Sequence, residues 1–224
     1  MVEVIKTIPC AAAKGLELAL MAVAISGTVE MSNLPASFGV KVGDPVSMSF
    51  FTLPAPVDRR SADDPKFRLQ DGIGLYPLCN ETFSLKVGPM TGSIGAYVAP
   101  LFEVPPWMQE ATFFALASKR PTLDNIFLSP AGVEAKPLPL VMKGTRGLYP
   151  PQFELSFNLV YNRGTIPGIH MKQAAAKEYT AEGLVKSTIT LATSYFPSNT
   201  AVSIKLSSIS MDDGTKTLVQ QLDA

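Results

Sequence analysis

His170 is the only histidine in this chain of 224 residues, and Cys10 and Cys79 are its only cysteines. Histidine is the usual proton shuttle and metal ligand near neutral pH, and a thiolate is the nucleophile of cysteine enzymes. The acid nearest to His170 in the sequence is Glu178, and no nucleophile motif surrounds the histidine. We therefore interpret His170 as a structural or interface residue. The scarcity predicts a protein that is not an enzyme, with no catalytic residue, metal site or cofactor.

Adjacent carboxylates are the remaining candidates for catalysis. They occur at Asp63-Asp64 and at Asp212-Asp213, and a pair of carboxylates is sufficient for glycoside hydrolysis. Both pairs lie in segments typical of turns, where aspartate is favoured because its side chain hydrogen-bonds the backbone nearby. A carboxylate-only enzyme such as a glycosidase is thus the third functional alternative.

The charge balance favours contact with other copies of the chain. Nineteen basic residues meet nineteen acidic ones, which gives a formal net charge of zero. A neutral protein has little long-range repulsion between copies, whereas a dominant nucleic-acid role needs a basic excess. We therefore expect a homo-oligomer, with no strong signal for nucleic acid and no evident small-molecule substrate.

The cysteine spacing and one apolar run bear on location. Two distant cysteines without a CxxC motif predict reduced thiols in the core of an intracellular soluble protein. The apolar run from Leu16 to Ile25 contains ten residues, about half of what a membrane-spanning helix needs. We interpret it as a core segment.

Six residues form the candidate interaction surface. They are Trp107, Lys119, Arg120, Lys143, Arg146 and Arg163. The basic members fall in expected loops, where they are able to form one face for an anionic membrane surface or RNA. The alternative is that they are scattered, solvated charges.

The elements that position these residues are mostly strands. Nineteen prolines and sixteen glycines disfavour long helices. Strands are predicted at Val2–Ile8, at Leu16–Met31 with a bend at Gly27, and at Val46–Leu53, Thr82–Val87, Ser93–Val98, Phe153–Tyr161, Val185–Phe196, Ala201–Met211 and Thr215–Leu222. The nine residues from Phe153 to Tyr161 alternate apolar and polar side chains, as a half-buried strand does.

Two short helices are expected beside these strands. Trp107 to Ser118 contains no Gly or Pro, and its apolar residues have the i, i+4 and i+7 spacing of one helical face. The second helix is predicted within Met171 to Leu184. Between them, Pro130 to Pro151 is interpreted as a long connection made of turns.

The fold class is therefore mainly β, a β-rich α+β protein. We predict an antiparallel sandwich or a jelly-roll-like sheet with two short helices. The whole chain, residues 1–224, is interpreted as a single domain. It comprises an N-terminal apolar segment 1–53, an exposed loop 54–65 and a main core 66–222.

The order of elements over roughly residues 80–211 resembles a viral family. The order runs through the strand Thr82–Val87, Trp107, Lys119-Arg120-Pro121, the apolar Ile126-Phe127-Leu128, Gly147-Leu148-Tyr149 before the strand Phe153–Tyr161, a helix, and a strand pair ending at Ile204–Ser210. This order is similar to the globular core of rhabdovirus-type matrix proteins, and jelly-roll viral coat and movement proteins resemble it nearly as well.

The resemblance implies a function and a location. A matrix-type protein is a non-enzymatic structural protein that self-assembles and bridges a membrane and a viral nucleocapsid. It is found in the virion and in the host-cell cytoplasm. The alternative resemblance implies a capsid or movement protein that binds single-stranded RNA.

Overall fold

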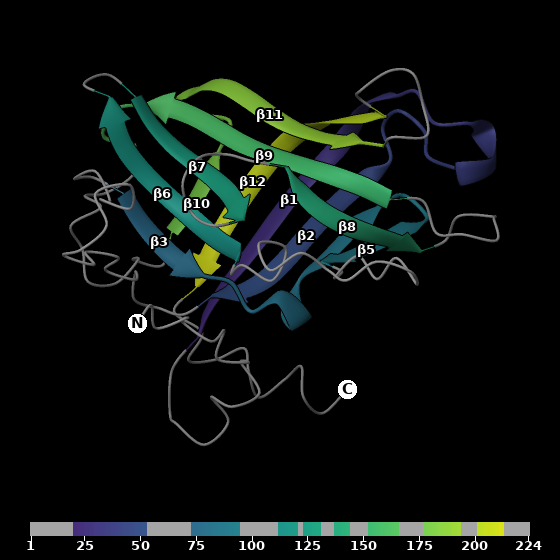
Figure 1. The fold of residues 1–224 in the computed structure, drawn as a ribbon. Helices are drawn as coiled ribbons and strands as arrows, with labels where there is room; N and C mark the ends of the chain where they lie inside the picture. The colour runs from purple at the N-terminus through teal and green to yellow at the C-terminus, as the bar shows by residue number, and fades with distance from the viewer. Residues whose placement is uncertain are drawn as a thin grey trace.

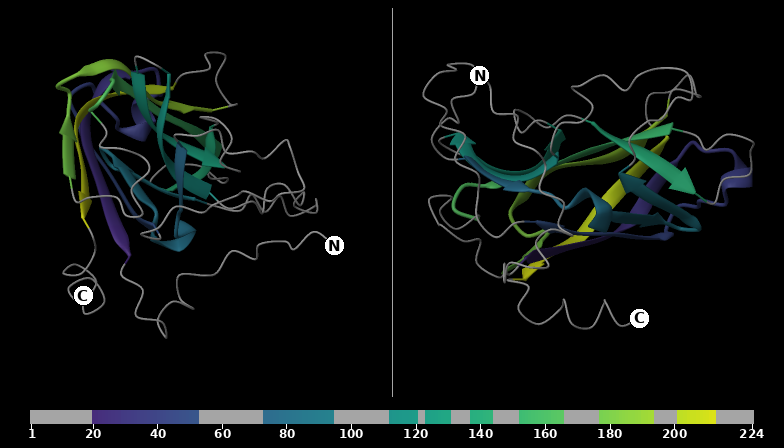
Figure 2. Two further views of the ribbon diagram at one scale, coloured as in Figure 1. Left: turned by 90° about the vertical axis from the view of Figure 1, so that its left-hand side faces the viewer. Right: turned by 60° about the horizontal axis from the view of Figure 1, so that its bottom comes forward.

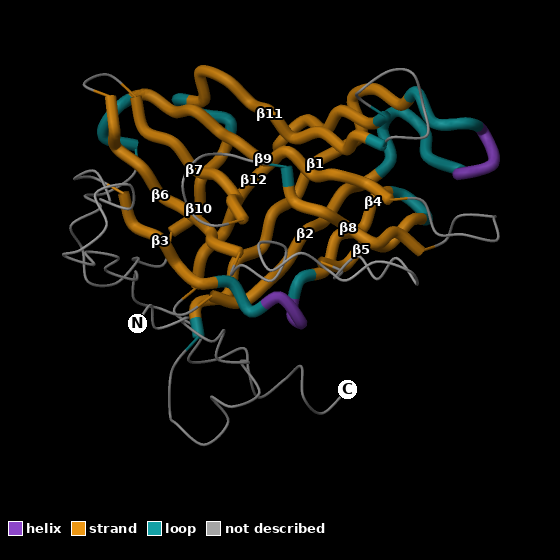
Figure 3. The backbone as a smooth tube through the Cα atoms, in the orientation of Figure 1, coloured by secondary structure: helices purple, strands orange, loops and turns teal. Residues whose placement is uncertain are grey.

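The computed structural model describes residues 20–52, 73–94, 112–120, 123–130, 137–143, 152–165, 177–193 and 201–212, and twelve strands make up most of this part of the chain (Figure 1). The strands are β1 (Met21–Ser32), β2 (Pro45–Thr52), β3 (Ile73–Pro77), β4 (Ser84–Val87), β5 (Met90–Ile94), β6 (Thr112–Arg120), β7 (Leu123–Pro130), β8 (Leu138–Lys143), β9 (Gln152–Asn162), β10 (Lys177–Thr180), β11 (Leu184–Ala192) and β12 (Val202–Asp212). Helical turns occur in this part of the chain only as the 3-10 segments η2 (Ala36–Phe38) and η4 (Asn80–Thr82) (Figure 3).

Eight of these strands close into an antiparallel barrel. The ring runs β12-β1-β2-β4-β5-β8-β9-β11 and returns to β12. It closes because β11 is hydrogen-bonded to two strands, with Ser156 of β9 opposite Thr190 and Val202 of β12 opposite Leu191. The predicted mainly β, antiparallel class is confirmed. The predicted sandwich or jelly roll is corrected to a barrel, since the edges that a sandwich leaves open are paired here.

The sheet forks at β9. Its first half pairs with β8, where Phe153 lies opposite Leu140, and its second half pairs with β7, where Tyr161 lies opposite Asp124. From β7 the sheet continues through β6 to β3 as a three-stranded branch (Figures 1 and 2). This branch returns to β2 through a single bridge between Leu78 and Thr52.

One apolar core is shared by the strands of the barrel and those of this branch. Every second residue of β9, from Phe153 to Tyr161, is buried, as the alternation predicts. Phe50 of β2 lies where the barrel wall and the three-stranded branch come together. Its ring centroid is 6.0 Å from that of Phe83, just before β4, and 5.5 Å from that of Phe114 on β6.

Neither predicted helix forms in the described residues. Thr112–Arg120 is the strand β6, with Phe114 and Leu116 buried two residues apart and with β3 and β7 as neighbours. Lys177–Thr180 is the strand β10, paired with β12. In both segments, backbone pairing with neighbouring strands of the sheet outweighs a weak local helix preference.

The remaining predictions have mixed outcomes. The strands expected near β1, β2, β9, β11 and β12 are confirmed. The connection expected over 130–151 is wrong at Leu138–Lys143, which is β8, and neither β3 nor β7 was predicted. The strand expected at Ser93–Val98 begins earlier, at Met90, because Gly88 makes the preceding turn tight with a φ of 54°. The predicted loop 54–65 and the strands at residues 2–8 and 215–222 lie outside the described residues.

Candidate functional sites

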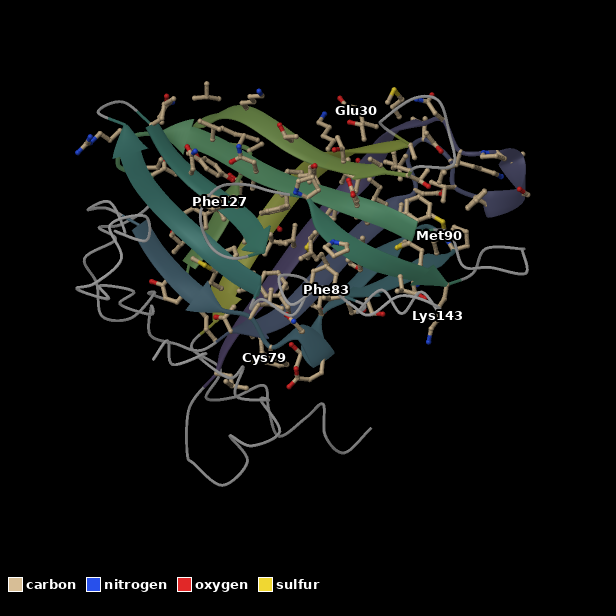
Figure 4. All side chains as sticks on the ribbon, viewed as in Figure 1. Glu30, Cys79, Phe83, Met90, Phe127 and Lys143 are labelled. Atoms are coloured by element: carbon tan, nitrogen blue, oxygen red, sulfur yellow. The ribbon has the colours of Figure 1, made fainter. Side chains whose placement is uncertain are left out.

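The members of the predicted interaction surface that the structure places lie near the two opposite ends of the strand β9. Arg163 is exposed in the turn that follows β9, and the end of β6 lies on the same side, because Arg120 pairs with Leu123 and Leu123 pairs with Asn162. Lys143 ends β8 beside the start of β9 (Figure 4). The 11 residues of β9 separate these two places by roughly 35 Å at about 3.3 Å per residue. The structure therefore groups Arg120 with Arg163 and places Lys143 apart from them.

The side chains of the other predicted residues lie outside the part of the chain that the structure describes. Lys119 lies on β6 next to Arg120, and the side chains of both are outside the described set. Trp107, Arg146 and His170 also lie outside the described residues.

Three tyrosines and one aspartate form a buried cluster that sequence reasoning missed. Tyr76 on β3, Asp124 on β7, Tyr161 on β9 and Tyr179 on β10 are between 0% and 3% exposed. The rings of Tyr161 and Tyr179 are 6.1 Å apart between centroids, and Asp124 lies directly across from Tyr161 in the sheet. Tyr161 donates a hydrogen bond of 3.0 Å to the carbonyl oxygen of Thr180. The one sequence signal was Tyr161, which ends the alternating strand.

Burial sets the protonation of this cluster. Loss of solvent raises the pKa of Tyr161 to about 12 and that of Tyr179 to about 12, and it also raises the pKa of Tyr76. For Tyr179, the negative charges of ionised Tyr161, ionised Tyr76 and Asp124 act in the same direction. The phenols are therefore neutral near pH 7, where they serve as hydrogen-bond donors and not as bases. Asp124 and Tyr179 each have further interactions within the structure.

Cys79 corrects the expectation of reduced thiols. Its side chain is buried, and the residue is disulfide-bonded. The residue, labelled in Figure 4, makes three hydrogen bonds through its backbone. The Cys79 N–H donates to the carbonyl of Phe51 at 2.9 Å, and the Cys79 carbonyl accepts from the Thr82 hydroxyl at 2.7 Å and from the Thr82 N–H at 2.9 Å.

Short hydroxyl side chains cover part of the outside of the barrel. We define the outer serine face as Ser208 and Ser210 of β12, Ala24, Ser26 and Thr28 of β1, and Ser47 and Ser49 of β2. The middle row of this face is Ser208, Ser26 and Ser47. The row continues beyond the face through Lys86 of β4, Thr91 of β5 and Lys143 of β8, and each residue lies directly opposite the next. All of these are exposed except Ser208, which is half-buried. The hydroxyl oxygens of Ser26 and Ser208 are hydrogen-bonded at 3.0 Å.

No group of three or more metal-ligating side chains occurs in the described residues. Asp124 is the one buried carboxylate in that part of the chain. No helix within the same ranges is long and apolar enough to cross a membrane. Comparison of the chain with protein-family models, curated proteins and solved structures finds no match.

Proposed function

We propose that this chain is a non-enzymatic structural protein that associates with copies of itself through the outer serine face. The observation that carries the proposal is the row Ser208–Ser26–Ser47, in which short side chains, half-buried at Ser208 and exposed at Ser26 and Ser47, lie side by side on three hydrogen-bonded strands. Adjacent strands are about 4.8 Å apart, so the hydroxyls form a regular array.

Such a face suits a second copy of itself. In a twofold dimer the same patch lies on both partners, so it must be self-complementary. A serine hydroxyl donates and accepts, and it is complementary to another hydroxyl, as the bond between Ser26 and Ser208 already illustrates within the sheet. The zero net charge of the chain removes long-range repulsion between the two copies.

The matrix-type role is the more specific form of this proposal. It adds an anionic membrane surface as a second partner and a viral nucleocapsid as a third. Three exposed lysines support the membrane part: Lys86 and Lys143, which flank Thr91 on neighbouring strands, and Lys205, which lies on the same side of the barrel opposite Thr28. A lysine near an anionic lipid surface contributes about 1 kcal/mol to binding.

Sedimentation equilibrium over a range of concentrations tests self-association. We expect the mass of the wild-type protein to rise with concentration, and the variants Ser26→Arg and Ser47→Arg to stay monomeric, because each places a long charged side chain on the face. Asn162→Arg is the matched control, since Asn162 is exposed at the far end of β9. A wild-type protein that is monomeric throughout contradicts the proposal.

Vesicle co-sedimentation tests the matrix-type form. The wild-type protein should bind phosphatidylserine vesicles better than phosphatidylcholine vesicles, and the Lys86→Glu/Lys143→Glu double variant should lose that preference. Equal binding by the wild-type protein and the double variant contradicts the membrane role. Cooperative binding to single-stranded RNA without vesicle binding favours the capsid or movement alternative.

A further inference from the structure

The disulfide at Cys79 has only one available partner within the chain. Cys79 is disulfide-bonded, and the sequence contains one other cysteine, Cys10. The structure describes the surroundings of Cys79 and not those of Cys10. The question is therefore whether the chain connectivity allows the two sulfurs to meet.

Strand pairing brings the start of β1 close to Cys79. Met21, the first residue of β1, lies opposite Thr52 at the end of β2, and Thr52 is bridged to Leu78. Two strand spacings amount to about 10 Å, and Cys79 follows Leu78 directly. The chain between Cys10 and Met21 reaches up to about 35 Å when extended. It is thus more than long enough to return to Cys79.

We propose that Cys79 is bonded to Cys10 of the same chain, and that this bond forms in an oxidising compartment and ties the segment before β1 to the barrel. In the bonding step the two thiols lose two protons and two electrons. A donor disulfide, such as oxidised glutathione or the active site of a thiol oxidase, accepts both electrons and leaves as two thiols. The exchange passes through a mixed disulfide.

The surroundings of Cys79 make the bond structural and not regulatory. Cys79 is 2% exposed, next to the fully buried Thr52. Thiol–disulfide exchange requires access for an attacking thiolate, and the three hydrogen bonds to the Cys79 backbone, one of them from the Thr82 hydroxyl, hold its position. Disulfides of this kind persist in oxidising compartments and are rare in the cytosol. The proposal therefore places the folded protein outside the cytosol. It is independent of the self-association proposed above, and it disfavours the matrix-type form, which the resemblance places in the host-cell cytoplasm.

Peptide mapping without reductant tests the proposal directly. The full chain is produced by export to an oxidising compartment, alkylated after denaturation, digested and analysed by mass spectrometry. We expect one cross-linked peptide pair that contains Cys10 and Cys79, and no alkylated cysteine until a reductant is added. Two alkylated thiols without reductant overturn the proposal. A disulfide-linked dimer on a non-reducing gel overturns it as well.

Variants separate the bond from the packing of Cys79. Because Cys79 is buried, Cys79→Ser alone is able to destabilise the fold for other reasons, so Cys10→Ser is the informative change. We expect Cys10→Ser to lower the Tm of the exported protein by roughly 10 °C, as the closure of a loop of this length implies. Reductant should lower the Tm of the wild-type protein similarly and leave that of Cys10→Ser unchanged. An unchanged Tm for Cys10→Ser contradicts the inference.

Discussion

Tyr161 on β9 donates its hydroxyl hydrogen to the carbonyl oxygen of Thr180 on β10, although these two strands are not paired. Among the described strands β10 pairs only with β12, and β11, which also pairs with β12, reaches it at Thr190 and Leu191 alone. The described part of the barrel wall therefore has no strand pairing between β9 and β10. A side-chain hydrogen bond connects these two strands where no backbone hydrogen bond does.

Replacing Tyr161 with phenylalanine should weaken this connection. The ring stays in the core, but Thr180 loses its donor, so we expect the free energy of unfolding to fall by about 1 kcal/mol. Urea unfolding measures the change, and hydrogen exchange should be faster for residues of β10. Thr180→Ser is the control, because it keeps both the carbonyl and the hydroxyl. An unchanged stability of Tyr161→Phe means that the bond contributes nothing.

The buried phenols predict a loss of stability at alkaline pH. In the unfolded chain a tyrosine ionises near pH 10, whereas the pKa of Tyr161 and that of Tyr179 are about 12 in the folded protein. Between these values the folded state holds more protons, so the free energy of unfolding falls as pH rises. The contribution is complete below pH 10 and lost above pH 12, and it amounts to at most about 3 kcal/mol for each tyrosine.

Urea unfolding as a function of pH checks this window. The stability of the wild-type protein should decline between about pH 10 and 12, with tyrosinate absorbance appearing together with unfolding. Tyr161→Phe should decline less steeply. A tyrosinate signal that titrates fully near pH 10 in the folded protein contradicts the buried cluster.

The strand β9 was predictable because its own sequence contains the complete alternating pattern of apolar and polar residues. Phe153, Leu155, Phe157, Leu159 and Tyr161 are apolar at every second position, and all five are at most 1% exposed. A period of two over nine residues fits a strand with one buried face and does not fit a helix.

The strand β6 was not predictable in this way. The spacing from Trp107 to Ala115 fits one helical face, and only pairing with β3 and β7 makes Phe114 and Leu116 neighbours on one side of a strand. β7 follows β6 directly in the sequence, but β3 lies far upstream, so a local window does not contain both partners. The tyrosine cluster escaped prediction for the same reason, since its members come from β3, β7, β9 and β10.

Phe50 should be one of the costliest positions to truncate. Its ring contacts Phe83, just before β4 of the barrel, and Phe114 on β6 of the three-stranded branch. Phe50→Ala therefore leaves a cavity where the barrel and the branch meet. We expect a loss of about 3–5 kcal/mol in the free energy of unfolding. Phe38→Ala is the control: Phe38 is partly buried and packs its ring edge-on against Phe153. Equal losses for both variants, measured by urea unfolding, contradict this account of the core.

Gly27 should not tolerate a side chain. The pairing of β1 with β12 shifts register between Ser26 and Gly27, where the sequence predicts a bend. A Cβ atom at Gly27 meets the backbone oxygen of Lys205 at 2.5 Å and the Cγ2 atom of Ile204 at 3.1 Å. A backbone oxygen in a paired strand has little room to yield, so Gly27→Ala must push β1 and β12 apart.

We expect Gly27→Ala to lower the free energy of unfolding by about 1–3 kcal/mol. The midpoint of urea unfolding measures this, and hydrogen exchange should increase on β1 and β12 together. Ala24→Ser is the matched control, because it adds one atom at an exposed position of the same strand. If Gly27→Ala is as stable as this control, the close approach of the two strands at Lys205 is wrong. The register shift then has another cause.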